Sequence, residues 1–494
     1  MMHPRRRLVL FLAGLGPRWL PFADVATPDL PLARLLRLSL FQVSVGMTLV
    51  LLVGTLNRVM IVELGVAASV VAAMIALPVL FAPFRALIGH RSDTHRCELG
   101  WRRVPFVWKG TLYQFGGYAI MPFALLVLAG AGESASAPPW LGVGAAALAF
   151  LLVGAGTHIV QTAGLALATD LTPPDSHPRV VGLMYVMLLI GMIASALLFG
   201  AALAEFTPGR LVQVIQGTAV ACVVLNGVAL WKQEPRNPPR GAVRAPDPSF
   251  RESWARFAAG GSAMRRLVVV GLGTMAFGMA DVLLEPYGGQ VLDWSVAATT
   301  TLTAFLALGG LAGFSVASLT LARGGDPYRL TLQAALLGVP AFGLVIAAAP
   351  LGLSASFVSG NVLIGFGAAL FGHATLTATM NLAPPGHAGL ALGAWGAVQA
   401  TAAGIAMALA GAIRDAVTFG AQALGLETGA AAGYLTVYAL EIVLLLVTIA
   451  ATLPLLRQGR DASPPAEAAG ASASRAGAED GPARAFSRSV GGAR

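Results

Sequence analysis

Twelve separate apolar stretches, each long enough to cross a membrane, run through this chain and limit its fold more than any other feature. A hydrocarbon layer about 30 Å thick needs about 20 apolar residues for one helical crossing. Within that layer every backbone N–H and C=O must be satisfied inside the protein, so helices are expected. The sequence therefore predicts an all-α integral membrane protein, with crossing helices near residues 37–62, 66–88, 104–129, 140–168, 180–204, 211–231, 266–287, 296–322, 328–349, 354–380, 388–413 and 431–456.

The composition supports the membrane class. Hydrophobic residues make up 56% of the 494 positions and charged residues only 11%, whereas soluble domains carry about 25% charged residues. The net charge of +9 does not require a nucleic acid partner, because Lys and Arg in cytoplasmic loops meet anionic membrane lipids.

The distribution of positive charge predicts the orientation. If both termini are cytoplasmic, 29 of the 32 Lys and Arg residues fall in cytoplasmic segments. Only Arg58, Arg210 and Arg414 then lie on the outer side. Such a bias is typical of membrane proteins.

These segments divide the chain into five parts. We expect a partly interfacial cytoplasmic segment (1–35), a first six-helix half (36–231), a cytoplasmic linker (232–264), a second six-helix half (265–456) and a disordered cytoplasmic tail (457–494).

The two halves share short sequence similarities in the same order. Residues 46–52 (GMTLVLL) parallel 278–284 (GMADVLL), and 170–175 (DLTPPD) parallel 381–386 (NLAPPG). Parallel repeats of six helices characterise the major facilitator architecture, which the sequence therefore predicts as two pseudo-symmetric bundles.

The loop after the second predicted helix supports that architecture. It resembles the facilitator pattern G-x-x-x-D-R-x-G-R-R, although Thr94 replaces the arginine that usually follows the aspartate. The residues that carry the resemblance are Gly89, Asp93, Arg96, Arg102 and Arg103.

Longer strings resemble one branch of this superfamily. Among them are residues 36–47 (LRLSLFQVSVGM), 54–65 (GTLNRVMIVELG), 161–170 (QTAGLALATD) and 277–288 (FGMADVLLEPYG). They are similar to the PucC/LhaA family of photosynthetic bacteria. Residues 16–24 (GPRWLPFAD) look more like the LhaA branch.

The resemblance implies a non-enzymatic role in assembling light-harvesting complexes at the bacterial inner membrane. It implies bacteriochlorophyll as the pigment handled and antenna polypeptides as partners, with pigment-synthesis enzymes as further candidates. The LhaA branch serves the core antenna and the PucC branch the peripheral antenna. The alternatives are a facilitator-type transporter of a small amphipathic molecule such as a tetrapyrrole, and a pigment-modifying enzyme, for which the sequence offers no catalytic set.

Ionisable side chains within the membrane cost about 2.5–3.5 kcal/mol on insertion scales, so each needs a partner or a purpose. Arg58 lies near the outer end of the first helix, and Asp281 and Glu285 lie one turn apart in the equivalent helix of the other half. We expect Arg58 to pair with Asp281 or Glu285 across the pseudo-two-fold axis, either as a gate or as a static ion pair.

His158 and His373 occupy equivalent helices of the two halves, and Gln161 follows His158 within about a turn. Since the family handles bacteriochlorophyll, a neutral imidazole is a candidate axial ligand for its magnesium. The alternative is a histidine bonded to a neighbouring helix or to water.

Two further acids are candidates for contacts. Asp170 ends the fourth helix, where it can meet Arg179 or the basic loop 91–103. Glu441 shares a face of the last, peripheral helix with Tyr434 and Tyr438, so we expect it to face a partner helix or lipid. No group of residues has the spacing of a metal site.

Overall fold

A computed structural model of the protein describes residues 30–80, 88, 92, 100–130, 136–173, 177–234, 263–380, 388–425 and 429–461. The first half contains α2 (Leu32–Leu38), α3 (Leu40–Leu49), η2 (Val50–Leu56), η3 (Val59–Glu63), α4 (Ala68–Leu80), α6 (Val104–Leu128), α7 (Pro139–Asp170), α8 (His177–Ala202) and α9 (Pro208–Leu230). The second half contains α11 (Ala263–Gly278), η6 (Ala280–Val282), α12 (Leu284–Gln290), α13 (Val296–Ala322), α14 (Pro327–Leu351), α15 (Ser354–Met380), α16 (Ala388–Ala423) and α17 (Gly429–Asp461).

The described helices agree with the predicted crossings. Eleven are long and apolar enough to span a membrane, and a shorter apolar helix, Ala68–Val79, occupies the place of the second crossing. The penultimate helix runs ten residues beyond its predicted end at residue 413. The last one continues to Asp461, past the predicted start of the tail. The remaining tail, the N-terminal segment before residue 30 and most of the linker lie outside the described residues.

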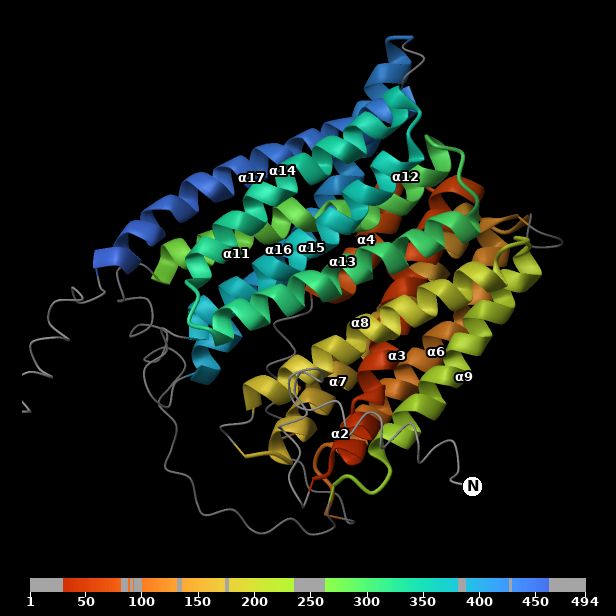
Figure 1. Cartoon of the computed structure of the whole chain (residues 1–494). Helices are drawn as coiled ribbons and strands as arrows, with labels where there is room; N and C mark the ends of the chain where they lie inside the picture. Colours follow the sequence, from red (N-terminus) through yellow and green to blue (C-terminus); the bar gives the residue numbers. More distant parts are fainter. Residues whose placement is uncertain are drawn as a thin grey trace, which may run out of the picture.

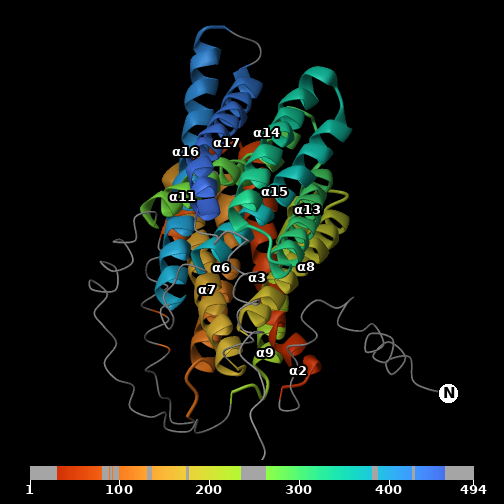
Figure 2. The ribbon, with the colours of Figure 1, turned by 60° about the vertical axis from the view of Figure 1, so that its left-hand side comes forward.

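The two halves form separate bundles that meet along one face (Figure 1). Helices α8 and α13 pack together on one side of this face and α4 and α16 on the other. These are equivalent pairs, because α4 and α13 are the second helices of their halves and α8 and α16 the fifth. The second view shows α6 and α7 in the first bundle and α14 and α15 in the second (Figure 2).

Glycines let neighbouring helices approach closely. A Cβ on Gly46 of α3 would lie 2.5 Å from the carbonyl oxygen of Leu188 in α8. A Cβ on Gly365 of α15 would lie 2.0 Å from that of Leu306 in α13. Small residues at such crossings are how membrane helices gain packing energy without a hydrophobic driving force.

The first crossing of each half is irregular. In the first half, η2 and η3 are π-helical. In the second half, the short 3₁₀ turn η6 separates α11 from α12. Pro286 explains this break: its ring has no N–H for the carbonyl of Val282, four residues earlier, and clashes with it.

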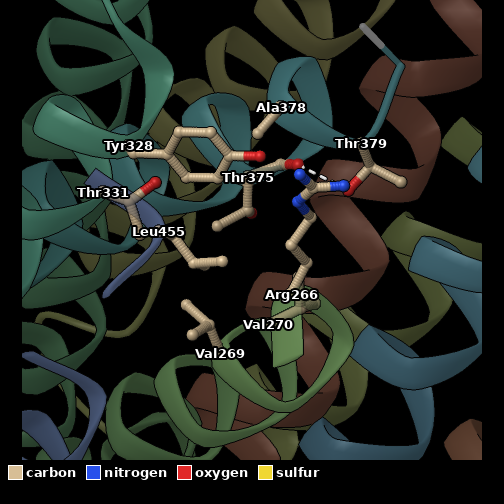
Figure 3. Close-up of a pocket in the computed structure, with 9 residues that line it drawn as sticks. All are labelled: Arg266, Val269, Val270, Tyr328, Thr331, Thr375, Ala378, Thr379 and Leu455. Atoms are coloured by element: carbon tan, nitrogen blue, oxygen red, sulfur yellow. Dashed lines mark hydrogen bonds between the residues drawn. The ribbon is translucent and has the colours of Figure 1, made fainter. Parts of the chain in front are cut away.

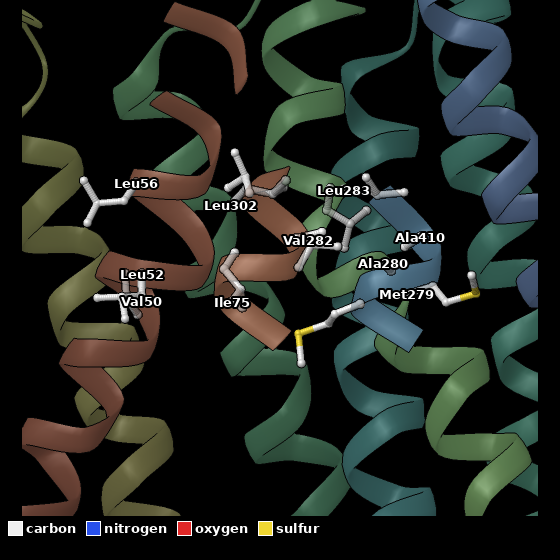
Figure 4. Close-up of a cluster of buried hydrophobic side chains, with 14 of the residues drawn as sticks. Val50, Leu52, Leu56, Ile75, Met279, Ala280, Val282, Leu283, Leu302 and Ala410 are labelled. Carbon is white, nitrogen blue, oxygen red and sulfur yellow. The ribbon is translucent and has the colours of Figure 1, made fainter. Parts of the chain in front are cut away.

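The two irregular helices meet in the core. One buried apolar cluster contains residues of both halves: Val50, Leu52 and Leu56 of η2 and Ile75 of α4 on one side, and Val282 and Leu283 beside the break and Ala410 of α16 on the other (Figure 4). Apolar side chains from both halves therefore pack together at the centre of the interface.

Candidate functional site

We call the end of the bundle that holds residues 30 and 461 the terminal end, and the opposite end, where residues 63–68, 203–207 and 291–295 lie, the distal end. Arg58 lies near the distal end of the first crossing. Its guanidinium forms an ion pair with Glu63 and donates a second hydrogen bond to the carbonyl of Trp294 in the other half, at 3.0 Å.

The expected pairing of Arg58 with Asp281 or Glu285 is therefore wrong as a direct ion pair. The reason is the local backbone. Glu63 follows Arg58 by five residues, and a π-helix places residues five apart on one face. In a regular α-helix residues five apart point about 140° away from each other. The expectation rested on the equivalent places of the two helices in their halves, which say nothing about such a π-turn.

Glu285 takes a different donor. Its Oε1 accepts a hydrogen bond from the hydroxyl of Thr303 in α13. The carboxyl lies against Gly54 of η2, where a Cβ would come within 2.3 Å of Oε1. Glu285 is buried and sits at the boundary between the halves without bonding to Arg58, although the charge of Arg58 still reaches it.

Further hydrogen bonds join the halves near this level. The Thr55 and Thr300 hydroxyl oxygens are 3.2 Å apart. The side-chain amide of Asn57 donates to the carbonyl of Val282 at 2.8 Å, which is the carbonyl that Pro286 leaves without a helical donor. Asn57 thereby satisfies one orphan group of the broken helix.

Two contacts involve the neighbouring segments. The backbone N–H of Ser69, at the start of α4, donates to Asp415 of α16 at 2.6 Å. Gln290, the last residue of α12, donates to the carbonyl of Ile61 at 3.4 Å. Each ties a distal helix end of one half to the other half.

Arg414 holds this set together within the second half. It is buried, pairs with Asp415 at 2.7 Å, donates to Gln290 and lies 4.8 Å from the ring centre of Tyr434. The distal end is therefore a closed polar seam between the halves, built on Arg58 and Arg414.

Glu441 lies deeper, and the structure corrects its expected role. The side chain is 0% exposed, so it faces neither lipid nor a partner. Its Oε1 accepts the backbone N–H of Ala280 at 2.6 Å. The helix break frees this N–H, and a buried donor needs an acceptor. The side chain of Asp281, the next residue, is exposed.

The pigment-ligand candidates lie in separate places. His158 and Gln161 lie on α7 and are half-buried. His373 lies on α15 with its ring centre 4.5 Å from that of Phe314. The structure does not bring His158 and His373 into one site, and no group of three metal-ligating side chains exists within the described residues.

At the terminal end, Asp170 meets the basic loop. It accepts hydrogen bonds from Arg102 at 3.2 Å and Arg103 at 3.0 Å. The side chain of Arg179 and the residues Gly89, Asp93 and Arg96 lie outside the described residues. Glu234, which no sequence pattern singles out, accepts the N–H groups of Arg102, Arg103 and Val104 with its carboxylate at the start of α6.

A small pocket of about 10 Å³ opens at the terminal end of the second half. Arg266 and Tyr328 reach into it from α11 and α14 (Figure 3), with the guanidinium carbon 5.8 Å from the ring centre. The hydroxyls of Thr331 and Thr379 donate to backbone carbonyls.

This arrangement defines a multi-pass membrane protein of the major facilitator fold. Among solved structures, it is similar to an inward-facing bacterial homologue of the lysosomal transporter Spinster (TM-score 0.64, 16% identity, 88% of this chain and 98% of that one). It is also similar to an inward-facing bacterial homologue of ferroportin (TM-score 0.62, 16% identity, 86% and 98%). At these identities the likeness concerns the fold alone.

Within that class, the chain belongs to the PucC family, whose model matches residues 55–460. It is 62% identical to the PucC protein of Rhodovulum sulfidophilum, over 82% of this chain and 90% of that protein. It is 58% identical to PucC of Rhodobacter capsulatus, over 91% and 97%.

A third relative has no PucC name. An uncharacterised protein from the puhA–bchM intergenic region of Rhodobacter capsulatus is 51% identical, over 91% of this chain and 94% of that protein. The PucC family is thus confirmed, whereas the LhaA branch stays a prediction.

Proposed function

We propose that the protein is a non-enzymatic assembly factor for bacterial light-harvesting complexes, which binds bacteriochlorophyll, antenna polypeptides or both within the membrane. The observation that carries the proposal is the 62% identity to a PucC protein over most of both chains. The family resemblance implies the assembly role, and a membrane protein with half-buried histidine and glutamine side chains on an apolar helix suits a pigment cargo.

His158 is the favoured residue for holding the pigment. Its imidazole lies on α7, an apolar helix of 32 residues, and Gln161 lies one turn further on. A neutral imidazole is a good magnesium ligand for a chlorin ring, and a neighbouring amide can donate to a ring carbonyl. His373, whose ring packs against Phe314, is the second candidate.

The membrane and its orientation belong to the same proposal. We place the protein in the bacterial inner or intracytoplasmic photosynthetic membrane, with the terminal end cytoplasmic and the distal seam on the outer side. The bias of Lys and Arg toward the terminal end supports this orientation. Membrane lipids and antenna polypeptides are the expected partners, and pigment-synthesis enzymes are further candidates.

Deletion and complementation test the proposal. In a pigmented host that lacks the gene, near-infrared absorption of whole cells should show loss of one antenna. Loss of the core antenna would support the LhaA-like assignment, and loss of the peripheral antenna the other branch. The wild-type gene should restore the antenna, His373→Phe should do the same, and His158→Ala should restore it poorly. Unchanged antenna levels in the deletion strain would overturn the assembly role.

A second candidate is transport of a small amphipathic molecule such as a tetrapyrrole. The specific observation in its favour is the closed distal seam in a frame that resembles inward-facing transporters. Uptake of a labelled tetrapyrrole into vesicles that contain the purified protein, dependent on Asp281, would favour transport. Absence of uptake, with pigment still bound, would favour assembly.

A further inference from the structure

Asp281 lies inside the break between α11 and α12, and its environment is unusual. Ala280 and Val282 on either side are buried, whereas Asp281 is exposed. Protein nevertheless surrounds the carboxyl closely enough to desolvate it. A side chain on the outer face of the bundle would not be surrounded in this way. Asp281 therefore faces water-accessible space inside the bundle.

Glu441 of α17 lies next to Asp281, because it bonds to the backbone of the preceding residue, Ala280. Its Oε1 accepts the Ala280 N–H, and its buried Oε2 has no hydrogen-bond partner among the described residues. The two carboxyls are close enough for the charge of Asp281 to act on Glu441. A fully buried carboxyl with one open oxygen, next to a second carboxyl, lacks a donor.

Tyr438 gives an independent indication. It precedes Glu441 by one turn of α17 and is 0% exposed, and no residue in the described part of the chain forms a hydrogen bond with its hydroxyl oxygen. The ring of Tyr438 packs edge-on against that of Tyr287, with 5.5 Å between the ring centres, and this packing restricts the rotation of the phenol. Its hydroxyl lies close enough to Glu441 for an electrostatic interaction.

No cation neutralises the pair within the part of the chain that the structure describes. Of the charged groups on the elements packed around it, Glu285, Arg58, Arg414 and Asp415 lie toward the distal end. Arg265 and Arg266 of α11 and Arg329 of α14 lie at the terminal end, with Arg266 about four helical turns before Asp281. Glu285 accepts from Thr303, Arg58 pairs with Glu63, and Arg414 pairs with Asp415. Tyr287 and Tyr434 are the other titratable neighbours. Their rings pack edge-on against each other, with 5.5 Å between the ring centres.

Two adjacent carboxylates without a cation are costly at membrane depth. A metal ion is a poor remedy here, since Ca²⁺ takes six to eight oxygen ligands and the described residues contain no such cluster. A proton needs only one carboxylate oxygen and a neighbour that accepts the hydrogen bond.

We propose that Asp281 and Glu441 form a proton-binding site within the membrane-spanning part of the second half. One carboxylate takes a proton from hydronium, which leaves water, and the other carboxylate accepts the resulting O–H as a hydrogen bond. The exposed Asp281 exchanges this proton with the internal water. The buried Glu441 shares the proton with Asp281 through the hydrogen bond.

The site is connected to η6, the short turn through which the second half contacts η2 of the first. Glu441 holds the Ala280 N–H, and Asn57 of the first half holds the Val282 carbonyl. Gain or loss of the proton changes the charge between these two anchors by one unit. Proton binding is thereby linked to the contact between the halves.

Infrared difference spectroscopy on the full-length protein in lipid tests the site, because a protonated carboxyl has a carbonyl stretch that a carboxylate lacks. Spectra are compared between mildly acidic and mildly alkaline buffer. All variants carry Glu285→Gln, which removes the other buried carboxyl of this region. With Asp281 and Glu441 intact, the protein should show one protonated-carboxyl band that titrates. The double variant Asp281→Asn/Glu441→Gln should lose it, whereas the control Glu205→Gln, an exposed acid paired with Arg210, should retain it.

The single variant Glu441→Gln tests in which direction Glu441 changes the proton affinity of Asp281. Without the neighbouring carboxylate, Asp281 releases its proton more easily, so the band should disappear at lower pH than with Glu441 intact. If the double variant does not fold, isotope-labelled aspartate or glutamate in the protein with both carboxyls intact must shift the band instead. The proposal would be overturned if the band survived the double substitution. It would also be overturned if sodium or magnesium ions abolished the band at constant pH, because a metal ion would then occupy the site.

Discussion

Arg58 is ion-paired with Glu63, five residues further along the same helix, and donates a hydrogen bond to the Trp294 carbonyl of the other half. The π-helical turns of the first crossing make this pair possible. As a result, the cation at the distal seam is neutralised within its own half. The halves can therefore separate there without leaving a charge unpaired.

The two partners of this pair should differ in their effect on stability. The side chain of Arg58 is 4% exposed and that of Glu63 is 37% exposed. Glu63→Gln leaves a buried cation unpaired, which costs about 3 kcal/mol, although the partial exposure of Glu63 lowers this figure. Arg58→Leu removes the buried charge and should cost about 1 kcal/mol. Thermal unfolding in detergent compares them, and a larger loss for Arg58→Leu would contradict the assignment.

Cysteines at Thr55 and Thr300 should form a disulfide across the halves. Their hydroxyl oxygens lie 3.2 Å apart at the distal seam, which suits the short separation of Cβ atoms in a disulfide. The experiment uses a chain whose Cys97 and Cys222 are replaced by alanine, with iodine as a membrane-permeant oxidant.

The matched control pairs Thr55→Cys with Thr301→Cys. Thr301 is the next residue of α13, but it faces Gly200 of α8. Thiol labelling should detect no free cysteine in the first pair and two in the control. Equal labelling of both pairs would mean that the seam is not closed.

Gly365→Ala should destabilise the second half. The added methyl group would lie 2.0 Å from the Leu306 carbonyl oxygen, so α13 and α15 must move apart, at a cost of about 1–3 kcal/mol. Gly343→Ala, on α14 with nothing within 4 Å, is the control and should be neutral or slightly stabilising. Unfolding in detergent measures both, and similar midpoints would refute the close approach.

Glu234→Ala should loosen the start of α6. Its carboxylate accepts three backbone N–H groups there, and loss of such a cap costs about 1–2 kcal/mol. The exposed Glu205→Ala should change stability by less than about 0.5 kcal/mol. Amide hydrogen exchange at residues 102–108 should rise in the first variant alone; unchanged exchange there would exclude the cap.

Most of the fold could be predicted from the sequence because lipid imposes a simple rule. Each crossing needs a long apolar run, and the predicted starts at residues 104, 296 and 354 coincide with those of α6, α13 and α15. The end of α16 could not be found in this way, since the helix continues through the charged residues Arg414 and Asp415. Their charges are satisfied inside the protein, which hydropathy does not reveal.

The site could be predicted only in part. The sequence showed that Arg58, Asp281 and Glu285 were costly and needed partners, but their partners depend on backbone irregularities. The π-turns direct Arg58 to Glu63, and the break caused by Pro286 exposes the N–H that Glu441 accepts. Glu441 was misplaced because a helical wheel identifies a polar face without showing what covers it.

Pigment binding tests the proposed function most directly. The full-length protein, expressed in a pigmented photosynthetic host and gently solubilised, should show the absorption of bacteriochlorophyll in a near-stoichiometric amount. His158→Ala should lower that amount, whereas His373→Phe should retain it. A colourless protein from cells with normal pigment content, for wild type and variants alike, would contradict pigment binding by this chain.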